Sequence, residues 1–182
     1  MDSRIILASA SPRRKELLSK LTKDFEIVVP QIEEKELGTP ARTAELNAIN
    51  KAYSINKEKN QIVIACDTVV ALGNKIYPKP KNRQDAIEML KELRGFWHKV
   101  ISGVAVLYYK LISFVEVSEV KIRNLTQEEI EGYVDNYKPY DKAGSYAIQD
   151  QVVVESYKGD YDNIVGLPIN RLQKILREIL DV

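Results

Sequence analysis

Residues Ile62 to Leu72 read Ile-Val-Ile-Ala-Cys-Asp-Thr-Val-Val-Ala-Leu, an apolar run that one polar pair, Asp67 and Thr68, interrupts. The run is much shorter than the roughly 20 apolar residues of a membrane-spanning helix. A short apolar run between polar segments is typical of a buried strand. We therefore expect a central strand at residues 62–65, with residues 69–72 continuing it after the polar pair.

Predicted strands and helices alternate on both sides of this run. Ser11 precedes Pro12 at one helix start, and Thr126 with Glu129 forms a capping box at another. The other helices are expected at 43–56, 82–95 and after 168, the strands at 5–8, 25–29, 97–109 and 111–122, and a loop with a strand at 140–150. Strands 97–109 and 111–122 form an expected antiparallel pair. The pattern predicts an α/β protein, a mixed β-sheet with flanking helices, in one domain over residues 1–182.

Charge and cysteine content argue against several kinds of partner. The chain has 27 Lys and Arg residues and 26 Asp and Glu residues, a net charge of +1. Such a balance gives no long-range attraction to nucleic acid or to an anionic membrane, so we expect neither as a partner. Cys66 is the only cysteine, and the apolar residues before Ser9 are too few for a signal peptide. We expect a cytoplasmic protein.

The segment Ser9-Ala10-Ser11-Pro12-Arg13-Arg14 ends the first strand and opens the first helix. Arginines in a first helical turn oppose the helix dipole, so Arg13 and Arg14 require a compensating anion or a solvated position. Backbone N–H groups at such a junction bind anions, and arginine forks match phosphate oxygens. The segment therefore predicts a phosphate site, with two solvated surface arginines as the alternative.

Asp67 places a carboxylate inside an apolar run, which is costly unless the charge is paired, hydrogen-bonded or bound to metal. An Asp that caps a turn between two strands is the alternative. The candidate neighbours are the acidic residues Glu33 and Glu34 and the basic residues Lys51 and Lys79. Because Mg²⁺ binds one or two carboxylates together with substrate phosphates, Glu34 and Asp67 are candidate metal ligands. Asp67 could alternatively, or also, act as the base toward an attacking water.

The segment from Asp141 to Gln149 gathers charge, glycine and an amide within nine residues. The amide of Gln149 offers both a donor and an acceptor, so it can pair with the edge of a base. The alternative is an ordinary polar loop in which Gln149 is exposed.

Taken in order, these motifs resemble the Maf family of nucleoside triphosphate pyrophosphatases, also called septum formation proteins. The resemblance covers essentially the whole chain. It rests on LASASPRRKELL, IEE, NKA, ACDTVV, PKP, the Gly95–His98 turn with SGV, DKAGSYAIQ and VGLPI. One such motif is weak, whereas the whole set in order makes a strong match.

The resemblance implies an elongated fold with a central cleft, related to the inosine triphosphate pyrophosphatases, and a homodimer. It implies cleavage between the α and β phosphates with a divalent cation, Mg²⁺ or Mn²⁺. A nucleoside monophosphate and pyrophosphate are the implied products. Asp67 matches the position of the proton acceptor. The positions that match the nucleotide pocket are Ser9, Arg13, Arg14, Glu34, Lys51, Lys79 and Gln149.

Three positions resemble the dTTP/UTP pyrophosphatase branch of that family: Arg13 after proline, Thr68 after Asp67, and Gln149 in Tyr-Ala-Ile-Gln. The 7-methyl-GTP branch more typically has an aromatic residue, Gln and Glu there. An amide suits a neutral pyrimidine edge, whereas a carboxylate suits a cationic methylated guanine. The resemblance thus adds Thr68 to the substrate-binding residues and implies dTTP and UTP as substrates, with modified pyrimidine nucleotides left open.

Two positions depart from the family pattern, and two other functions remain open. Asp150 replaces the usual glycine and adds negative charge near the expected base pocket, and Cys66 stands where a smaller residue is common. The alternatives are a purine-directed enzyme like the inosine triphosphate pyrophosphatases, and a nucleotide-binding regulator of septation without significant turnover. The expected role of the enzyme is nucleotide-pool house-cleaning linked to cell division arrest.

Overall fold

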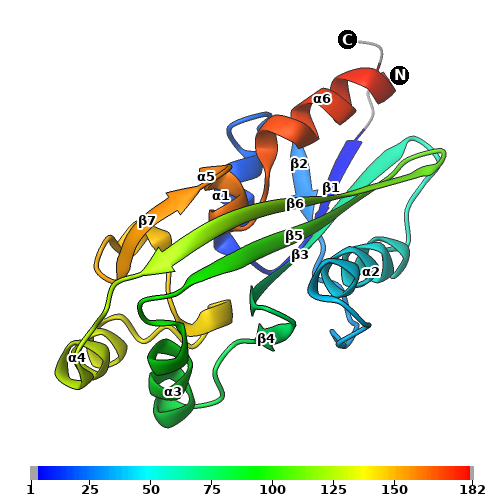
Figure 1. Ribbon diagram of the computed structural model, residues 1–182. Coiled ribbons are helices and arrows are strands. Elements are labelled where there is room, and N and C mark those ends of the chain that lie inside the picture. Colours follow the sequence, from blue (N-terminus) through cyan, green and yellow to red (C-terminus); the bar gives the residue numbers. More distant parts are fainter. Residues whose placement is uncertain (1–3, 181–182) are drawn as a thin grey trace.

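The computed structural model describes residues 4–180, which form one long twisted sheet with helices on both faces (Figure 1). The strands are β1 (Arg4–Ala8), β2 (Phe25–Ile27), β3 (Gln61–Leu72), β4 (Lys75–Tyr77), β5 (Trp97–Leu107), β6 (Leu111–Ile122) and β7 (Val154–Lys158). The helices are α1 (Pro12–Leu18), α2 (Pro40–Tyr53), α3 (Arg83–Leu93), α4 (Gln127–Tyr137), α5 (Tyr161–Val165) and α6 (Ile169–Leu180), with 3-10 turns η1 (Ala143–Ser145) and η2 (Ile148–Asp150).

The sheet mixes parallel and antiparallel pairs, as predicted. Its strand order is β2-β1-β3-β5-β6-β7, and β4 pairs with β3 outside this path. β1 runs parallel to both β2 and β3. The other pairs are antiparallel, including the long β5–β6 hairpin that the sequence predicts. The mixed-sheet α/β class is therefore confirmed.

Several local predictions are wrong. β3 runs without a break through Asp67, so this residue lies inside a strand and not on a turn between two strands. Residues 140–150 form two 3-10 turns and contain no strand. The sequence also did not predict β4, β7 or α5, because each has only three to five residues and shows no clear periodicity.

Alternation of side chains along β3 decides which helices cover which part of the sheet. Ile62 and Ile64 lie in one buried cluster with leucines of α1 and α6. Val63 and Ala65 belong to a second cluster with alanines of α2. Val70 lies in a third cluster with α3 and α4 at the far end of the molecule.

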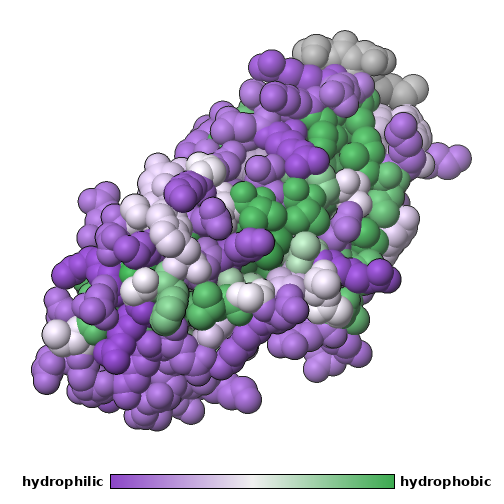
Figure 2. Space-filling model, viewed as in Figure 1, coloured by the Kyte–Doolittle hydropathy of each residue, from purple (hydrophilic) through white to green (hydrophobic). Residues whose placement is uncertain are grey.

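Hydrophilic and apolar residues occupy different parts of the surface. Figure 2 shows hydrophilic outer surfaces on α3 and α4 and an apolar band along the middle of the β5–β6 hairpin. Among the described residues, no helix is both long enough and apolar enough to span a membrane.

A gap in strand pairing opens along one edge of β3. β1 pairs with β3 only as far as Ala65, and β4 pairs with it only from Val70 onward. On the other edge, β5 pairs with β3 throughout this stretch. Within the described part of the chain, residues 66–69 therefore have no strand neighbour on the first edge. Asp67 and Thr68, which point to opposite faces, can both be reached from this gap.

Gly103 brings helix α2 close to the same stretch of β3. It lies opposite Asp67 in the β3–β5 register. A Cβ on Gly103 would lie 2.3 Å from the carbonyl carbon of Ala44 in α2, well inside van der Waals contact. Because the obstructing atoms belong to the helix backbone, only a residue without a side chain allows this approach. Polar side chains of α2 are thereby held against Asp67.

Candidate functional site

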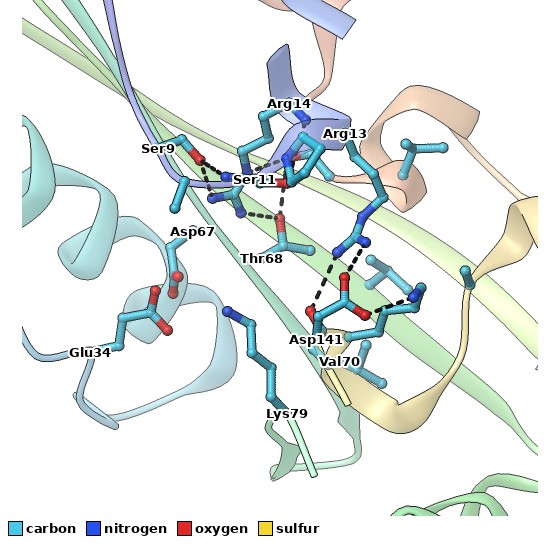
Figure 3. Close-up of a pocket in the computed structure, with 18 of the residues that line it drawn as sticks. Ser9, Ser11, Arg13, Arg14, Glu34, Asp67, Thr68, Val70, Lys79 and Asp141 are labelled. Carbon is cyan, nitrogen blue, oxygen red and sulfur yellow. Dashed lines mark hydrogen bonds and ion pairs between the residues drawn. The ribbon is translucent and has the colours of Figure 1, made fainter. Parts of the chain in front are cut away.

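A cavity of about 300 Å³ occupies the gap between β1 and β4 (Figure 3). Its size lies within the range of small-molecule sites. The β1–α1 turn, the loop before α2, the middle of β3 and residues 141–149 all contribute to its wall. Glu33, a candidate neighbour of Asp67, does not line this cavity. Nine predicted catalytic or binding residues do line it: Ser9, Arg13, Arg14, Glu34, Lys51, Asp67, Thr68, Lys79 and Gln149.

Neutral partners hold the guanidinium of Arg14 in place. Its Nε donates to the carbonyl of Gly166 at 2.9 Å, its Nη2 to Oγ1 of Thr68 at 3.1 Å, and its Nη1 to Oγ of Ser9 at 3.5 Å. Because none of these three partners carries a charge, the positive charge of Arg14 remains available to an anion in the cavity. Arg14 is therefore not the solvated surface residue of the alternative interpretation.

Two serines shape the turn that carries the arginines. Oγ of Ser11 accepts from the N–H of Arg14 at 3.4 Å, which is the predicted N-cap of α1. Oγ of Ser9 in turn accepts from the N–H of Ser11 at 3.1 Å. These bonds set the direction in which α1 leaves β1, so that its first turn borders the cavity.

Arg13 pairs with an acid that lies 128 positions away in the sequence. Its Nη1 is 2.8 Å from Oδ2 of Asp141, and its Nη2 donates to the carbonyl of Asp141 at 3.4 Å. Partial burial by itself would raise the pKa of Asp141, but Lys142 and Arg13 lower it to about 2. This pair joins α1 to the segment that carries Gln149. The compensating anion expected for the arginines is thus, for Arg13, a carboxylate of the chain itself.

Lys51 lies between the two predicted acidic residues of the site. Its Nζ is 2.6 Å from Oε1 of Glu34 and 2.8 Å from Oδ1 of Asp67, and it donates to the carbonyl of Cys66 at 3.3 Å. The side chains of Lys51 and Asp67 are 8% and 6% exposed, whereas that of Glu34 is half exposed. Burial acts to raise the pKa of Glu34, but Lys51, with Lys79 and Arg14, holds that pKa below its usual value.

Asn47 is a residue of the site that the sequence motifs did not identify. It is buried, and its Nδ2 donates to Oδ2 of Asp67 at 3.2 Å. Its position four residues before Lys51 could have identified it, because this spacing places both side chains on one face of α2. An asparagine between alanines at buried helix positions is costly unless its amide is hydrogen-bonded.

Lys79 and Gln149 face the cavity from two other segments. Both side chains are exposed at its mouth. In Figure 3, Lys79 extends from below into the space between Glu34 and Asp141. Gln149 lies in η2, so the alternative of an exposed glutamine in a polar turn is right about its exposure. That turn nevertheless forms part of the cavity wall.

Asp150 and Cys66, which depart from the family pattern, both make hydrogen bonds to other parts of the chain. Asp150 does not belong to the cavity wall; its Oδ2 accepts from the hydroxyl of Tyr133 at 2.5 Å. The same hydroxyl accepts from the N–H of Ala147 at 3.2 Å. Burial, reinforced by the bond to Asp150, raises the pKa of Tyr133, so the hydroxyl stays a donor. Cys66 is buried, and its thiol donates to the carbonyl of Gly166 at 3.3 Å.

Tyr133→Phe should loosen the turn that presents Gln149. The change removes the donor to Asp150 and leaves the buried N–H of Ala147 without this acceptor, so the free energy of unfolding should fall by about 1–3 kcal/mol. Urea unfolding measures this loss. Tyr137→Phe is the matched control, because Tyr137 stacks on Tyr133 from the same helix. Equal stability of the two variants would show that the Tyr133 hydroxyl does not hold this turn.

The donor groups of the site suit a divalent cation only together with a phosphate-bearing ligand. Within residues 4–180, no group of three or more His, Cys, Asp or Glu side chains could hold a metal. Glu34 and Asp67 are two carboxylates joined by one ammonium group. Mg²⁺ commonly takes one or two carboxylates plus water and substrate phosphates, so the residues fit a cation that binds with its substrate.

Comparison with known proteins agrees with these features. A family model described as Maf-like protein matches residues 4–179. A dTTP/UTP pyrophosphatase of Thermosipho africanus is 47% identical over 177 residues, covering 95% of this chain and 92% of that protein. A dTTP/UTP pyrophosphatase of Aquifex aeolicus is 42% identical, covering 97% of this chain and 95% of that protein.

A solved structure shares the fold at low sequence identity. A HAM1 protein from Coxiella burnetii matches with a TM-score of 0.51 and 16% identity, covering 97% of this chain and all of that one. At this identity the match bears on the fold alone, and it agrees with the predicted architecture.

Proposed function

The chain belongs to the family of Maf-like proteins, and we propose that it hydrolyses dTTP and UTP to the nucleoside monophosphate and pyrophosphate. It is a nucleoside triphosphate pyrophosphatase, like relatives that match it over nearly their whole length. One observation carries the proposal: the buried carboxylate of Asp67 lines the same cavity as Arg13 and Arg14. Neither the purine-directed enzyme nor the regulator without turnover is favoured.

The charges of the cavity suit a triphosphate. Five cationic side chains line it against three carboxylates. Arg14 presents a guanidinium held only by neutral groups in the contacts described above, and Lys79 lies at the mouth. Such groups stabilise negative charge that develops on phosphoryl oxygens. We therefore assign the phosphate chain to the space between Arg14, Arg13 and Lys79.

Asp67 is the proposed proton acceptor. A water oxygen forms a bond to the α-phosphorus, the bond from that phosphorus to the bridging oxygen of the β-phosphate breaks, and a water proton passes to Asp67. Lys51 and Asn47 each contact a different oxygen of this carboxylate, which fixes its orientation. Pyrophosphate leaves with the electron pair of the broken bond.

We propose Mg²⁺ or Mn²⁺ as the cofactor, with Glu34 and Asp67 as its protein ligands. When bound, such a cation supplies positive charge near the phosphate oxygens and helps to orient them. The carboxylate of Glu34 is half exposed, so it can turn toward a bound cation. Dialysis against a chelator should abolish pyrophosphate release, and either cation should restore it.

A substrate panel tests the proposal as a whole. Pyrophosphate release is measured for dTTP, UTP, ITP and XTP with Mg²⁺ or Mn²⁺. We expect dTTP and UTP to give the highest kcat/KM. A preference for ITP or XTP would overturn the pyrimidine assignment, and no release from any nucleotide would favour the regulator.

Gln149→Glu should weaken pyrimidine recognition. Uracil and thymine share a carbonyl acceptor next to an N–H donor, which an amide can satisfy and a carboxylate cannot. We expect kcat/KM for dTTP and UTP to fall about 10–100-fold. Gln151→Glu makes the same change on an exposed side chain outside the cavity wall and serves as the control. Equal kcat/KM for the two variants would remove Gln149 from base recognition.

The remaining expectations rest on the family resemblance. We propose that the protein works as a homodimer in the cytoplasm, with no nucleic acid or membrane partner, and that its role is house-cleaning of the nucleotide pool with a link to cell division arrest. Sedimentation of the purified protein tests the dimer; a monomer at micromolar concentration would contradict it.

A further inference from the structure

Three buried polar residues form a stripe along helix α2. Thr43, Asn47 and Lys51 follow one another at intervals of four residues, so their side chains lie on one face. They are only 3%, 3% and 6% exposed. The neighbouring buried positions of the helix carry alanines. Polar side chains are buried at a cost unless they are hydrogen-bonded, so the stripe requires partners.

All three residues contact the same acidic loop segment, residues 34–37. Oγ1 of Thr43 accepts from the N–H of Leu37 at 2.9 Å. Asn47 accepts from the N–H of Lys35 at 3.2 Å and donates to its carbonyl at 3.0 Å. Lys51 reaches the carboxylate of Glu34. The segment therefore runs antiparallel to α2, because the residue numbers of the loop partners fall as those of the helix rise.

The distance between successive stripe residues along α2 matches the distance between their partners along the loop. Four helical residues advance by about 6 Å, and two residues of extended chain advance by about 6.6 Å. Thr43 and Asn47 can accordingly bind Leu37 and Lys35, two positions apart, without distorting either backbone. The match explains how a loop without helix or strand is held at three successive points.

Asn47 connects this segment with the catalytic centre. Its Oδ1 accepts from Lys35, while its Nδ2 donates both to the carbonyl of Lys35 and to Oδ2 of Asp67. Both amide hydrogens and the amide oxygen are thus in use. A leucine would fill the same space but would make none of these bonds. The polar side chain therefore joins the loop backbone to the carboxylate.

We propose that the Thr43–Asn47–Lys51 stripe docks the acidic segment against Asp67, and that Asn47 is a positioning residue that sets the placement of Glu34 relative to Asp67. The inference rests on the proposed function only for its effect on turnover. The docking itself is a property of the protein without nucleotide, so the two are tested by separate measurements.

Asn47→Leu is the central variant, and Asn50→Leu is its matched control. Asn50 lies on the exposed side of the same helix, so the chemical change is identical but the stripe stays intact. Native protein without nucleotide is treated with trypsin, which cuts after the exposed Lys35 once the segment leaves the helix. We expect Asn47→Leu to be cut there about tenfold faster than wild type, and Asn50→Leu at the wild-type rate.

Turnover of dTTP provides the second readout. In Asn47→Leu we expect kcat to fall about 10-fold or more, with KM changed by less than about threefold, because the arginines that hold the phosphates are unaffected. A merely structural role would lower the amount of active enzyme without changing cleavage at Lys35 in the folded fraction. If wild type releases no pyrophosphate, the proposed function fails, and the cleavage rates alone decide the docking.

Two further variants keep the inference testable if Asn47→Leu does not fold. Thr43→Val deletes only the bond to Leu37, so cleavage at Lys35 should rise about threefold while kcat changes little. In Asn47→Asp the side chain still accepts from the N–H of Lys35 but cannot donate to Asp67. We therefore expect kcat to fall as in Asn47→Leu, and cleavage at Lys35 to be slower than in Asn47→Leu. Wild-type cleavage and wild-type kcat in both Asn47 variants would overturn the inference. If Asn47→Leu does not fold, wild-type cleavage in Asn47→Asp and Thr43→Val, together with wild-type kcat in Asn47→Asp, would overturn it.

Discussion

Asp67→Asn should lower kcat for dTTP by about 10²–10⁴-fold while the protein stays folded. The asparagine amide has the shape of the carboxylate but cannot accept the proton of the attacking water. Lys51 loses one of its two carboxylates and keeps Glu34 and the carbonyl of Cys66 as partners. Pyrophosphate release measures the loss, and circular dichroism checks the fold.

The same variant separates chemistry from binding. Arg13 and Arg14 are unchanged in Asp67→Asn, so nucleotide affinity measured by calorimetry without divalent cation should stay within about threefold of wild type. Asp24→Asn makes the same substitution on an exposed side chain outside the cavity and should behave as wild type. Wild-type turnover in Asp67→Asn would remove Asp67 from the mechanism.

Lys51→Met should give the largest loss of stability. The ammonium group of Lys51 is the cationic partner that joins Asp67 to Glu34, and methionine leaves the buried carboxylate of Asp67 without it. Breaking a buried ion pair from one side costs about 3–5 kcal/mol of unfolding free energy. The half-exposed Glu34 contributes little to this loss, because solvent screens it. Urea unfolding at neutral pH measures the change.

The small part of the loss in Lys51→Met that comes from Glu34 should disappear in acid. The pKa of Glu34 is lower in the folded protein than its ordinary 4.5, mainly because Lys51 opposes the effect of burial. Its contribution to stability is therefore present above pH 4.5 and fades as the pH falls through the folded-state pKa. Lys59→Met, an exposed lysine, is the control for the substitution. A stability difference of less than about 1 kcal/mol at neutral pH would contradict the buried pair.

Much of the local structure follows from the sequence because its causes are local. The caps at Ser11, Asn82 and Thr126 are each made within three residues along the chain, and all three are present. Short elements escape such prediction: β7 exists because it pairs with the end of β6, and its mostly exposed residues carry little pattern of their own. Asp67 was expected to interrupt a strand, whereas long-range pairing with β5 carries the strand through it.

The sequence by itself determined the family, because the motifs occur in the order that the family has, and it named nine residues that line one cavity. The tertiary structure decided how those groups are arranged. Only folding pairs Arg13 with Asp141, turns Asp150 away from the cavity toward Tyr133, and brings Asn47 to Asp67. The physical reason is distance along the chain. Caps and apolar periodicity act within a few residues, whereas the approach of α2 to β3 depends on the missing side chain of Gly103.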